Sequence, residues 1–280
     1  MSRILPLTAL AMVAFAANSL LCRLALRDTA IDPAGFTLIR LVSGALVLWL
    51  LLRLRTQQGP ARHGDWPSAA ALFVYAIFFS YAYIGLSAGA GALLLFGSVQ
   101  ATMILHALWR GERLSAWQSA GLLLAVGGLV ALVMPGVAAP RLPAALLMVL
   151  AGVAWGVYSL RGRGNADPLA TTTGNFLRSV PLAVAAALLA LPWLGFDLRG
   201  SVIAALSGAV ASGLGYAIWY AALRGLSATV AATVQLSVPA LAALGGVALL
   251  AEPLTLRLLL ASAATLGGIA LVIHMRRTLA

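Results

Sequence analysis

Ten long runs of apolar residues, separated by short segments rich in Pro, Gly or charge, constrain this chain more than any other feature. A helix rises about 1.5 Å per residue, so about 20 apolar residues cross a hydrocarbon core of ~30 Å. Because that core holds no water, backbone groups inside it must pair within helices. We therefore predict an all-α integral membrane protein with ten transmembrane helices, at about residues 4–23, 33–53, 67–86, 90–109, 115–134, 143–160, 169–191, 200–222, 228–250 and 256–275.

Composition excludes a soluble domain, because 62% of the residues are hydrophobic and only 9% are charged, against about 25% in soluble proteins. The net charge of +11 comes from arginines that lie singly or in pairs between apolar runs, which is typical of the loops of a membrane protein. We therefore expect the lipid bilayer as a partner, and no nucleic acid. The single cysteine, Cys22, excludes an internal disulfide. Because Leu21 before it is not small, we expect the first apolar run to stay as a membrane helix and not to be cleaved as a signal peptide.

Several short motifs return after 140 residues, which is half of the 280-residue chain. The shared register of these anchors across two apolar spans predicts two copies of one unit, residues 1–139 and 140–280. The anchors are GLSA at 85–88 and 225–228, ERLS at 112–115 against EPLT at 252–255, and the glycine pairs at 127–128 and 267–268. Within the first spans, the same shift pairs Phe15 with Trp155, Ser19 with Ser159 and Arg23 with Arg163.

Five spans in each half is an odd number, so the second copy must cross the membrane in the opposite sense. Inverted repeats of this kind are typical of secondary transporters, whose site lies near the midplane between the repeats. The alternative is a simple duplication in a channel or a membrane enzyme. Ten spans also place both termini on one side, and eleven arginines on that side against five on the other predict that both termini are cytoplasmic in a bacterial inner membrane.

This pattern resembles the EamA branch of the drug/metabolite transporter superfamily over the whole chain. The likeness rests on the ten spans, the repeat, Arg40 early in the second span, the GERLS stretch at 111–115 and its AEPLT counterpart at 251–255. The aromatic-rich third, sixth and eighth spans are similar, less specifically, to YddG-type exporters of aromatic amino acids. The resemblance implies a helical bundle around a central cavity that exports small metabolites. It further implies that spans one, three, four, six, eight and nine line the cavity, and that spans five and ten pack outside.

Aromatic residues supply the first set of candidate substrate-binding residues, because rings in mid-span can stack on a flat substrate. The alternative for rings near a span end is an interfacial belt. Trp155 is the strongest candidate, because Gly152 and Gly156 beside it predict a close helix contact. The set comprises Tyr75, Phe79 and Tyr83 at every fourth residue of the third span, Trp155 and Tyr158 on the sixth, and Tyr216 and Trp219 beside Tyr220 on the eighth.

Polar residues inside the spans form a second set, because an unpaired amide or charge in lipid is costly. We select Asn18, Ser19, Gln100 and Gln235, for which interhelical hydrogen bonding is the alternative role. Arg178 is a candidate clamp for a carboxylate or phosphate, or else a structural residue. For Arg40 and His106 we favour structural roles near helix ends.

All seven acidic residues lie at span ends or in loops, so no carboxylate is available at mid-membrane for tight proton coupling. Facilitated transport or exchange is therefore expected. We expect Glu112 and Glu252 to brace helix ends, with a gate role as the alternative. The sequence contains no Walker-type loop, metal-ligand cluster or Ser-His-Asp arrangement, so we predict no cofactor and no enzymatic activity.

These observations predict an inner-membrane exporter of small amphipathic metabolites, most of all aromatic or hydrophobic amino acids, that works by alternating access. A nucleobase, a sugar derivative or a cationic drug is the alternative cargo. A membrane enzyme or scaffold is a third reading, but the longest loop, around residues 55–66, is short for a partner-binding domain. We expect a monomer, with a dimer as the alternative.

Overall fold

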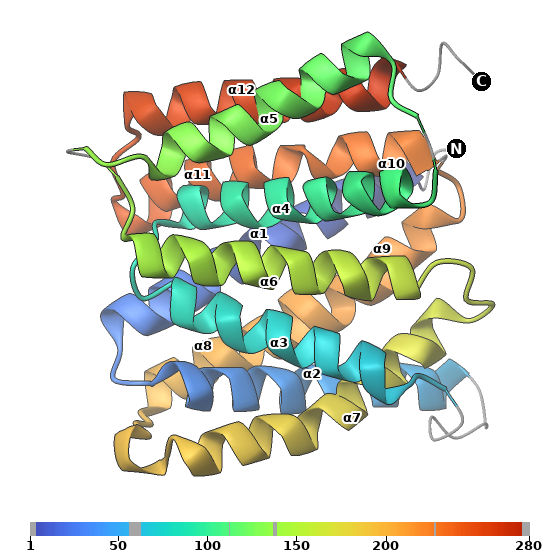
Figure 1. Cartoon of the computed structure of the whole chain (residues 1–280). Helices are drawn as coiled ribbons and strands as arrows, with labels where there is room; N and C mark the ends of the chain where they lie inside the picture. Colours follow the sequence, from blue (N-terminus) through green and yellow to red (C-terminus); the bar gives the residue numbers. More distant parts are fainter. Residues whose placement is uncertain (1–3, 56–62, 112, 137–138, 227, 276–280) are drawn as a thin grey trace.

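A computed structural model describes residues 4–55, 63–111, 113–136, 139–226 and 228–275. This part of the chain folds into helices, with no strand (Figure 1). The helices are α1 (Ile4–Asp28), α2 (Pro33–Arg55), α3 (Trp66–Ala82), α4 (Ala88–Trp109), α5 (Ala116–Val133), α6 (Leu142–Arg161), α7 (Pro168–Leu189), α8 (Leu198–Leu206), α9 (Gly215–Leu223), α10 (Ala228–Gln235), α11 (Ser237–Leu250) and α12 (Leu256–Met275), with a 3₁₀ turn, η2 (Leu191–Trp193), and a π-helix, η3 (Ser207–Leu214).

Eight helical segments are long and apolar enough to cross a membrane. One of them runs continuously through α8, η3 and α9 as Leu198–Leu223, and another joins most of α10 to α11 as Val230–Leu250. The shorter apolar helix α3 and the 22-residue α7 complete the ten predicted segments. The start of α1 and the end of α12 lie at the same end of the bundle, on the right of Figure 1. We call this the terminal end and the opposite one the distal end.

The ninth predicted span, 228–250, is present as the segment Val230–Leu250, but its helix is interrupted. It divides at Leu236 into α10 and α11. Pro239 explains the break, because proline lacks a backbone N–H and its ring collides with the carbonyl four residues earlier. That carbonyl belongs to Gln235, the last residue of α10. The equivalent position in the first half is Val99, and α4 there is uninterrupted.

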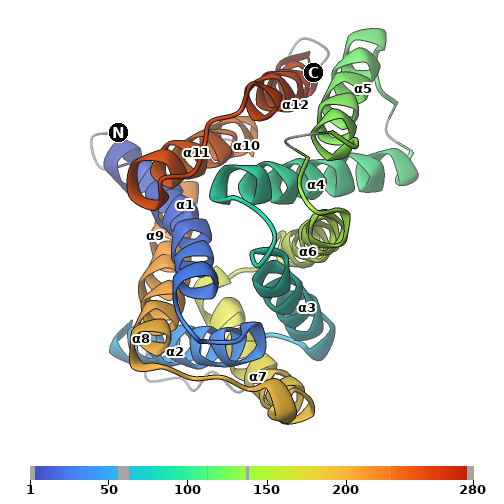
Figure 2. The same ribbon diagram turned by 90° about the vertical axis from the view of Figure 1, so that its left-hand side faces the viewer.

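Helices α5 and α12 pack against each other at one edge of the bundle, outside the ring formed by the other helices (Figure 2). Glycines bring their backbones together, as expected where helices pack in lipid. A β-carbon added at Gly128 would lie 2.8 Å from the backbone nitrogen of Thr265. The other glycine of this pair, Gly127, and its counterpart Gly267 are not in close contact, because each has open space where a β-carbon would point.

This contact predicts different effects for two adjacent substitutions. Gly128→Leu should force α5 and α12 apart and lower the free energy of unfolding by about 1–3 kcal/mol, the usual cost of overpacking. Gly127→Leu is the matched control and should leave stability nearly unchanged. Thermal unfolding of the two purified variants in the same detergent measures the difference. Equal melting temperatures would contradict the close contact.

Candidate functional site

A cavity of about 390 Å³ enters the bundle from the terminal end. Its mouth is formed by residues 162–165, which follow α6, and by Leu223 at the end of α9. Close to Leu223, Gly225 packs against Ile4 at the start of α1, which places this mouth at the end of the bundle where the termini lie. The cavity contains six of the residues selected from the sequence, Gln100, Trp155, Tyr158, Tyr216, Trp219 and Gln235.

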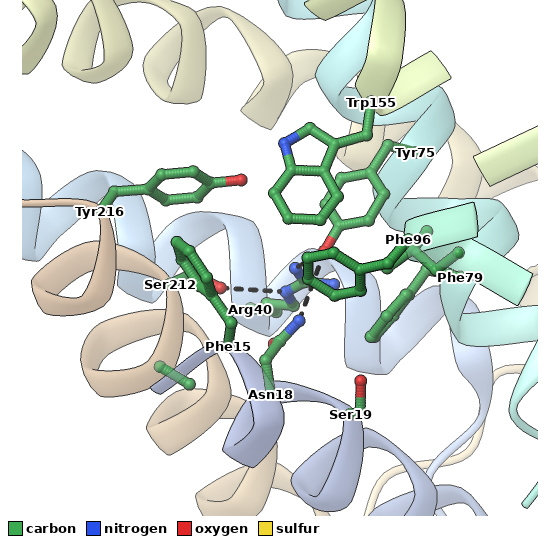
Figure 3. A pocket seen from close by; sticks show the side chains of 12 residues that line it. Phe15, Asn18, Ser19, Arg40, Tyr75, Phe79, Phe96, Trp155, Ser212 and Tyr216 are labelled. Carbon is green, nitrogen blue, oxygen red and sulfur yellow. Dashed lines mark hydrogen bonds between the residues drawn. The ribbon is translucent and has the colours of Figure 1, made fainter. Parts of the chain in front are cut away.

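A second, much smaller space of about 10 Å³ adjoins this cavity deeper in the bundle (Figure 3). Its volume is about that of one water-sized group. Phe15, Trp155 and Tyr216 line both spaces, so they stand where the two adjoin. The smaller pocket adds four residues selected from the sequence, Asn18, Ser19, Tyr75 and Phe79, together with Arg40, Leu95, Phe96, Ala211 and Ser212.

Trp155 lies at the centre of an aromatic cluster at this junction. Its indole stacks on the ring of Tyr75 with centroids 5.2 Å apart, and it meets Phe15 and Phe96 edge to face at 6.1 and 5.3 Å. The predicted close helix contact beside it is confirmed. A β-carbon added at Gly152 would lie 2.5 Å from Cβ of Ser98 on α4. The glycines of α6 therefore press this helix onto α4 and hold the indole toward the two pockets.

Neutral polar groups extend from the aromatic cluster toward the cavity mouth. The hydroxyls of Thr172 and Tyr220 lie 2.8 Å apart, and Tyr158 donates to Thr172 over 3.4 Å. These three side chains line the cavity together with Asn175 and Thr171. Helix α7 is therefore part of the wall, and Arg40 of α2 lines the smaller pocket, which widens the set of lining helices that the family resemblance implies.

An ion pair braces the cavity wall at the terminal end. Arg161 at the end of α6 donates to Asp65 over 2.9 Å and to the hydroxyl of Ser68, which lines the cavity. Partial burial acts to raise the pKa of Asp65, but hydrogen bonds from the Ser68 backbone and hydroxyl and from Arg161 outweigh it and hold that pKa below its usual value. Asp65 is therefore a carboxylate at neutral pH, and its charge is compensated by Arg161.

At the distal end, polar contacts tie α1 to the segments that follow α3 and α11. Arg23 forms an ion pair with Glu252 over 3.0 Å and donates to the carbonyls of Tyr83 and Ile84 over 2.8 and 3.1 Å. Glu252 also accepts a hydrogen bond from the backbone N–H of Ala88, the first residue of α4, over 2.8 Å. The expectation that Glu252 braces a helix end is thus confirmed, whereas Glu112 lies outside the described residues.

Two residues selected from the sequence, Tyr83 and Arg178, lie outside the lining of both pockets. Tyr83 is fully buried, packs edge to face on Phe79 at 4.8 Å and donates to the carbonyl of Ala88. Arg178 donates to the carbonyls of His63 and Gly174 over 2.6 and 3.0 Å, and so ties α7 to the segment before α3. The structural alternative for Arg178 fits these contacts better than the anion clamp.

Conversely, the structure places in the site several residues that were not selected from the sequence. Phe15 carried a usable signal, because the 140-residue register already pairs it with Trp155. The position of Arg40, seven residues after the start of α2, favours a structural role, yet Arg40 is 3% exposed and lines the smaller pocket. Position within the span does not reveal which of Arg40 and Arg178 faces the pockets, because the face that each helix presents depends on packing.

Comparison with known proteins supports the architecture. The EamA-like transporter family matches this chain twice, over residues 3–134 and 142–274. An uncharacterized protein of Pseudomonas aeruginosa is 58% identical over 274 residues, which is 98% of this chain and 96% of that protein. An uncharacterized transporter of Archaeoglobus fulgidus is 29% identical over 216 residues, or 72% of this chain and 74% of that protein.

One solved crystal structure superposes with a TM-score of 0.66 and covers 95% of this chain and 99% of its own. At 21% identity this likeness shows the shared fold. The two family matches together span almost the whole chain and agree with the helical segments described above. The chain is a multi-pass membrane protein and belongs to the EamA-like transporter family.

Proposed function

We propose that this protein is a bacterial inner-membrane exporter of small amphipathic metabolites, above all aromatic or hydrophobic amino acids. The observation that carries the proposal is the cavity of about 390 Å³ that is lined by aromatic and neutral polar side chains and reaches Trp155. Small-molecule sites commonly occupy about 300–1,000 Å³ and combine apolar walls with a few polar groups. A transporter, rather than an enzyme, also agrees with the family and with the name of the archaeal relative.

Alternating access between the halves 1–139 and 140–280 would move the substrate across the membrane. The two family matches support these halves as one repeated unit. The packing supports a twofold relation between them, because α2 packs on α7, α4 on α11 and α5 on α12, each helix with its own counterpart. The contact of α3 with α6 is likewise mirrored by that of α8, η3 and α9 with α1. With five spans in each half, such a relation makes the repeat inverted.

The two ends of the site differ in the way that alternating access requires. At the terminal end, Arg163 lines the open cavity. At the distal end, its repeat counterpart Arg23 is engaged with Glu252 and with two carbonyls. The excess of arginines in the loops at the terminal end supports a cytoplasmic location for that end. The protein would then be open to the cytoplasm, ready to load a metabolite for export.

The charges in the lining support facilitated transport or exchange and argue against a cationic cargo. In the described part of the chain, no aspartate or glutamate lines either pocket. A proton-coupled transporter usually keeps a carboxylate within the membrane. A cationic drug would also require a negative partner there, so a flat, uncharged or anionic body suits these walls better.

Transport should depend on Trp155. Purified protein in liposomes should give saturable flux of labelled tryptophan and phenylalanine, and less of threonine. Trp155→Ala should lower the tryptophan flux about five- to tenfold, because an aromatic pair contributes about 0.5–1.5 kcal/mol beyond the area it buries. Trp155→Phe should restore part of it.

Trp117→Ala is the matched control, because Trp117 lies on α5 with 66% of its surface exposed, and it should transport normally. Absence of saturable flux for all three amino acids would remove the amino-acid proposal.

The cavity should be accessible from the terminal end only. Ser159 lines it, whereas its repeat counterpart Ser19 lines the smaller pocket and is 1% exposed. Ser159→Cys should therefore react with an impermeant thiol reagent at least about tenfold faster than Ser19→Cys, because local opening must precede reaction of a buried group. Added substrate should slow the Ser159→Cys reaction. The native Cys22 is fully buried and gives little background. Equal rates at both positions would contradict the one-sided opening.

Loosening the distal contacts should favour opening at that end. Glu252→Gln keeps the shape but removes the charge that pairs with Arg23, and removing one partner of a largely buried ion pair costs more than removing one partner of an exposed pair. In the Ser19→Cys background, this change should raise labelling from the distal side severalfold. Asp28→Asn is the control, since Asp28 pairs with its neighbour Arg27 at the same end and within the same helix. If Glu252→Gln changed labelling no more than Asp28→Asn did, the Arg23–Glu252 pair would not hold this end closed.

A further inference from the structure

Arg40 is a cation buried within the bundle, and none of the ion pairs among the described residues involves it. Its side chain is 3% exposed and lies about 10 Å along α2 from the first residue of that helix. The arginines Arg23, Arg55 and Arg161 each pair with a carboxylate near a helix end. Among the described residues, no carboxylate lies within 4.0 Å of the Arg40 guanidinium. Buried charges in proteins are normally paired, and charges within membranes mark functional sites.

The neighbours of Arg40 satisfy only part of its guanidinium. Nη2 donates to the hydroxyl of Tyr75 over 2.9 Å, and Nε donates to the hydroxyl of Ser212 over 3.3 Å. The rings of Tyr75 and Phe79 lie 5.2 and 4.9 Å from Cζ, within the range of cation–π attraction. Nη1 is buried and has no hydrogen-bond partner in the part of the chain that the structure describes. All of these contacts are neutral, so neither the positive charge nor the donors on Nη1 are compensated.

The surrounding structure holds the guanidinium in a fixed position. Asn18 donates to the same Tyr75 hydroxyl over 3.3 Å and accepts from Ser207 over 2.8 Å, which links α1, α3 and η3. The π-helix η3 carries both Ser207 and Ser212, and π-helical turns often occur at functional sites. Gly208 in η3 lies against the Arg40 carbonyl with no room for a side chain. A donor fixed in this way loses little entropy when it binds a ligand.

Arg40 lines the smaller pocket, whose free space of about 10 Å³ accommodates one water-sized group (Figure 3). A carboxylate oxygen has this size, and a guanidinium is the side chain that pairs best with a carboxylate. The space is too small for a ring. The larger cavity next to it is not, and Phe15, Trp155 and Tyr216 line both.

We propose that Arg40 binds the carboxylate of the transported metabolite through Nη1. One carboxylate oxygen enters the smaller pocket, while the flat apolar body of the metabolite stays in the larger cavity beside Trp155 and Tyr216. This inference rests on the proposed transport function and narrows its substrate class to carboxylates with a flat apolar body. Because no acidic residue in the described part lines either pocket, an ammonium group on the substrate has no charged partner and is not required.

Four related probes separate the carboxylate from the rest of the substrate. Tryptophan and indole-3-propionate carry a carboxylate, whereas tryptamine and tryptophanamide do not. Calorimetric titration of the detergent-purified wild-type protein should show the two carboxylates binding at least about tenfold more tightly, the scale expected for a charge-assisted pair. If the carboxylate-free probes bound as tightly, the role of Arg40 would be refuted while aromatic transport still stood. If none of the four bound or was transported, both proposals would fail.

Two variants then assign the preference to Arg40. Arg40→Gln should remove the advantage of the two carboxylates and leave the affinities of tryptamine and tryptophanamide almost unchanged. Trp155→Ala should instead weaken all four probes by a similar factor, because stacking does not distinguish them. Arg40→Lys keeps the positive charge but lacks the planar, two-pronged set of donors of a guanidinium, so it should retain part of the preference for the two carboxylate probes. It replaces Arg40→Gln if the glutamine variant does not fold. A loss of affinity for all four probes with Arg40→Gln would mean that Arg40 only supports the fold.

Discussion

Close contact between helix backbones is the constraint on which this structure depends. Lipid tails are as apolar as the helix surfaces, so the hydrophobic effect does not drive two membrane helices together. Helix association therefore depends on close packing. Glycine supplies that packing in three places: between α5 and α12 at the outer edge, between α6 and α4 beside Trp155, and between η3 and α2 beside Arg40. The last two contacts border the pockets, so the packing that builds the bundle also positions the site.

The site combines an aromatic wall with a buried cation, Arg40, that has no carboxylate partner among the described residues. Trp155, with the rings of Tyr75 and Phe96 beside it, provides a surface on which a flat group can stack. This stacking does not depend on the polar groups of the substrate. Arg40 lies behind that wall, held by neutral hydroxyls and rings. A substrate able to satisfy both would gain from stacking and from neutralising a buried charge. In the described part of the chain, the charged residues that line the two pockets are the arginines Arg40 and Arg163.

The difference between the two ends of the bundle arises in a chain whose halves share one motif set. Arg23 and Arg163 occupy equivalent positions, but only Arg23 forms an ion pair among the described contacts. The halves also diverge locally: Pro239 breaks the ninth span, whereas Val99 leaves α4 intact. Under the proposed alternating access, unequal contacts at the two ends would be exchanged when the cavity opens to the other side.

The sequence by itself determined the helical class, the ten apolar segments and Trp155 as a central ring, because the length of an apolar run and the residues beside a ring are local properties of the chain. It also directed attention to ten residues that the structure places around the two pockets. Tertiary structure decided the rest. Arg40, and not Arg178, lines a pocket, and Tyr83 is buried in the core. The larger cavity opens at the terminal end. These outcomes depend on the direction in which each helix faces, and only contacts between segments distant in sequence determine that direction.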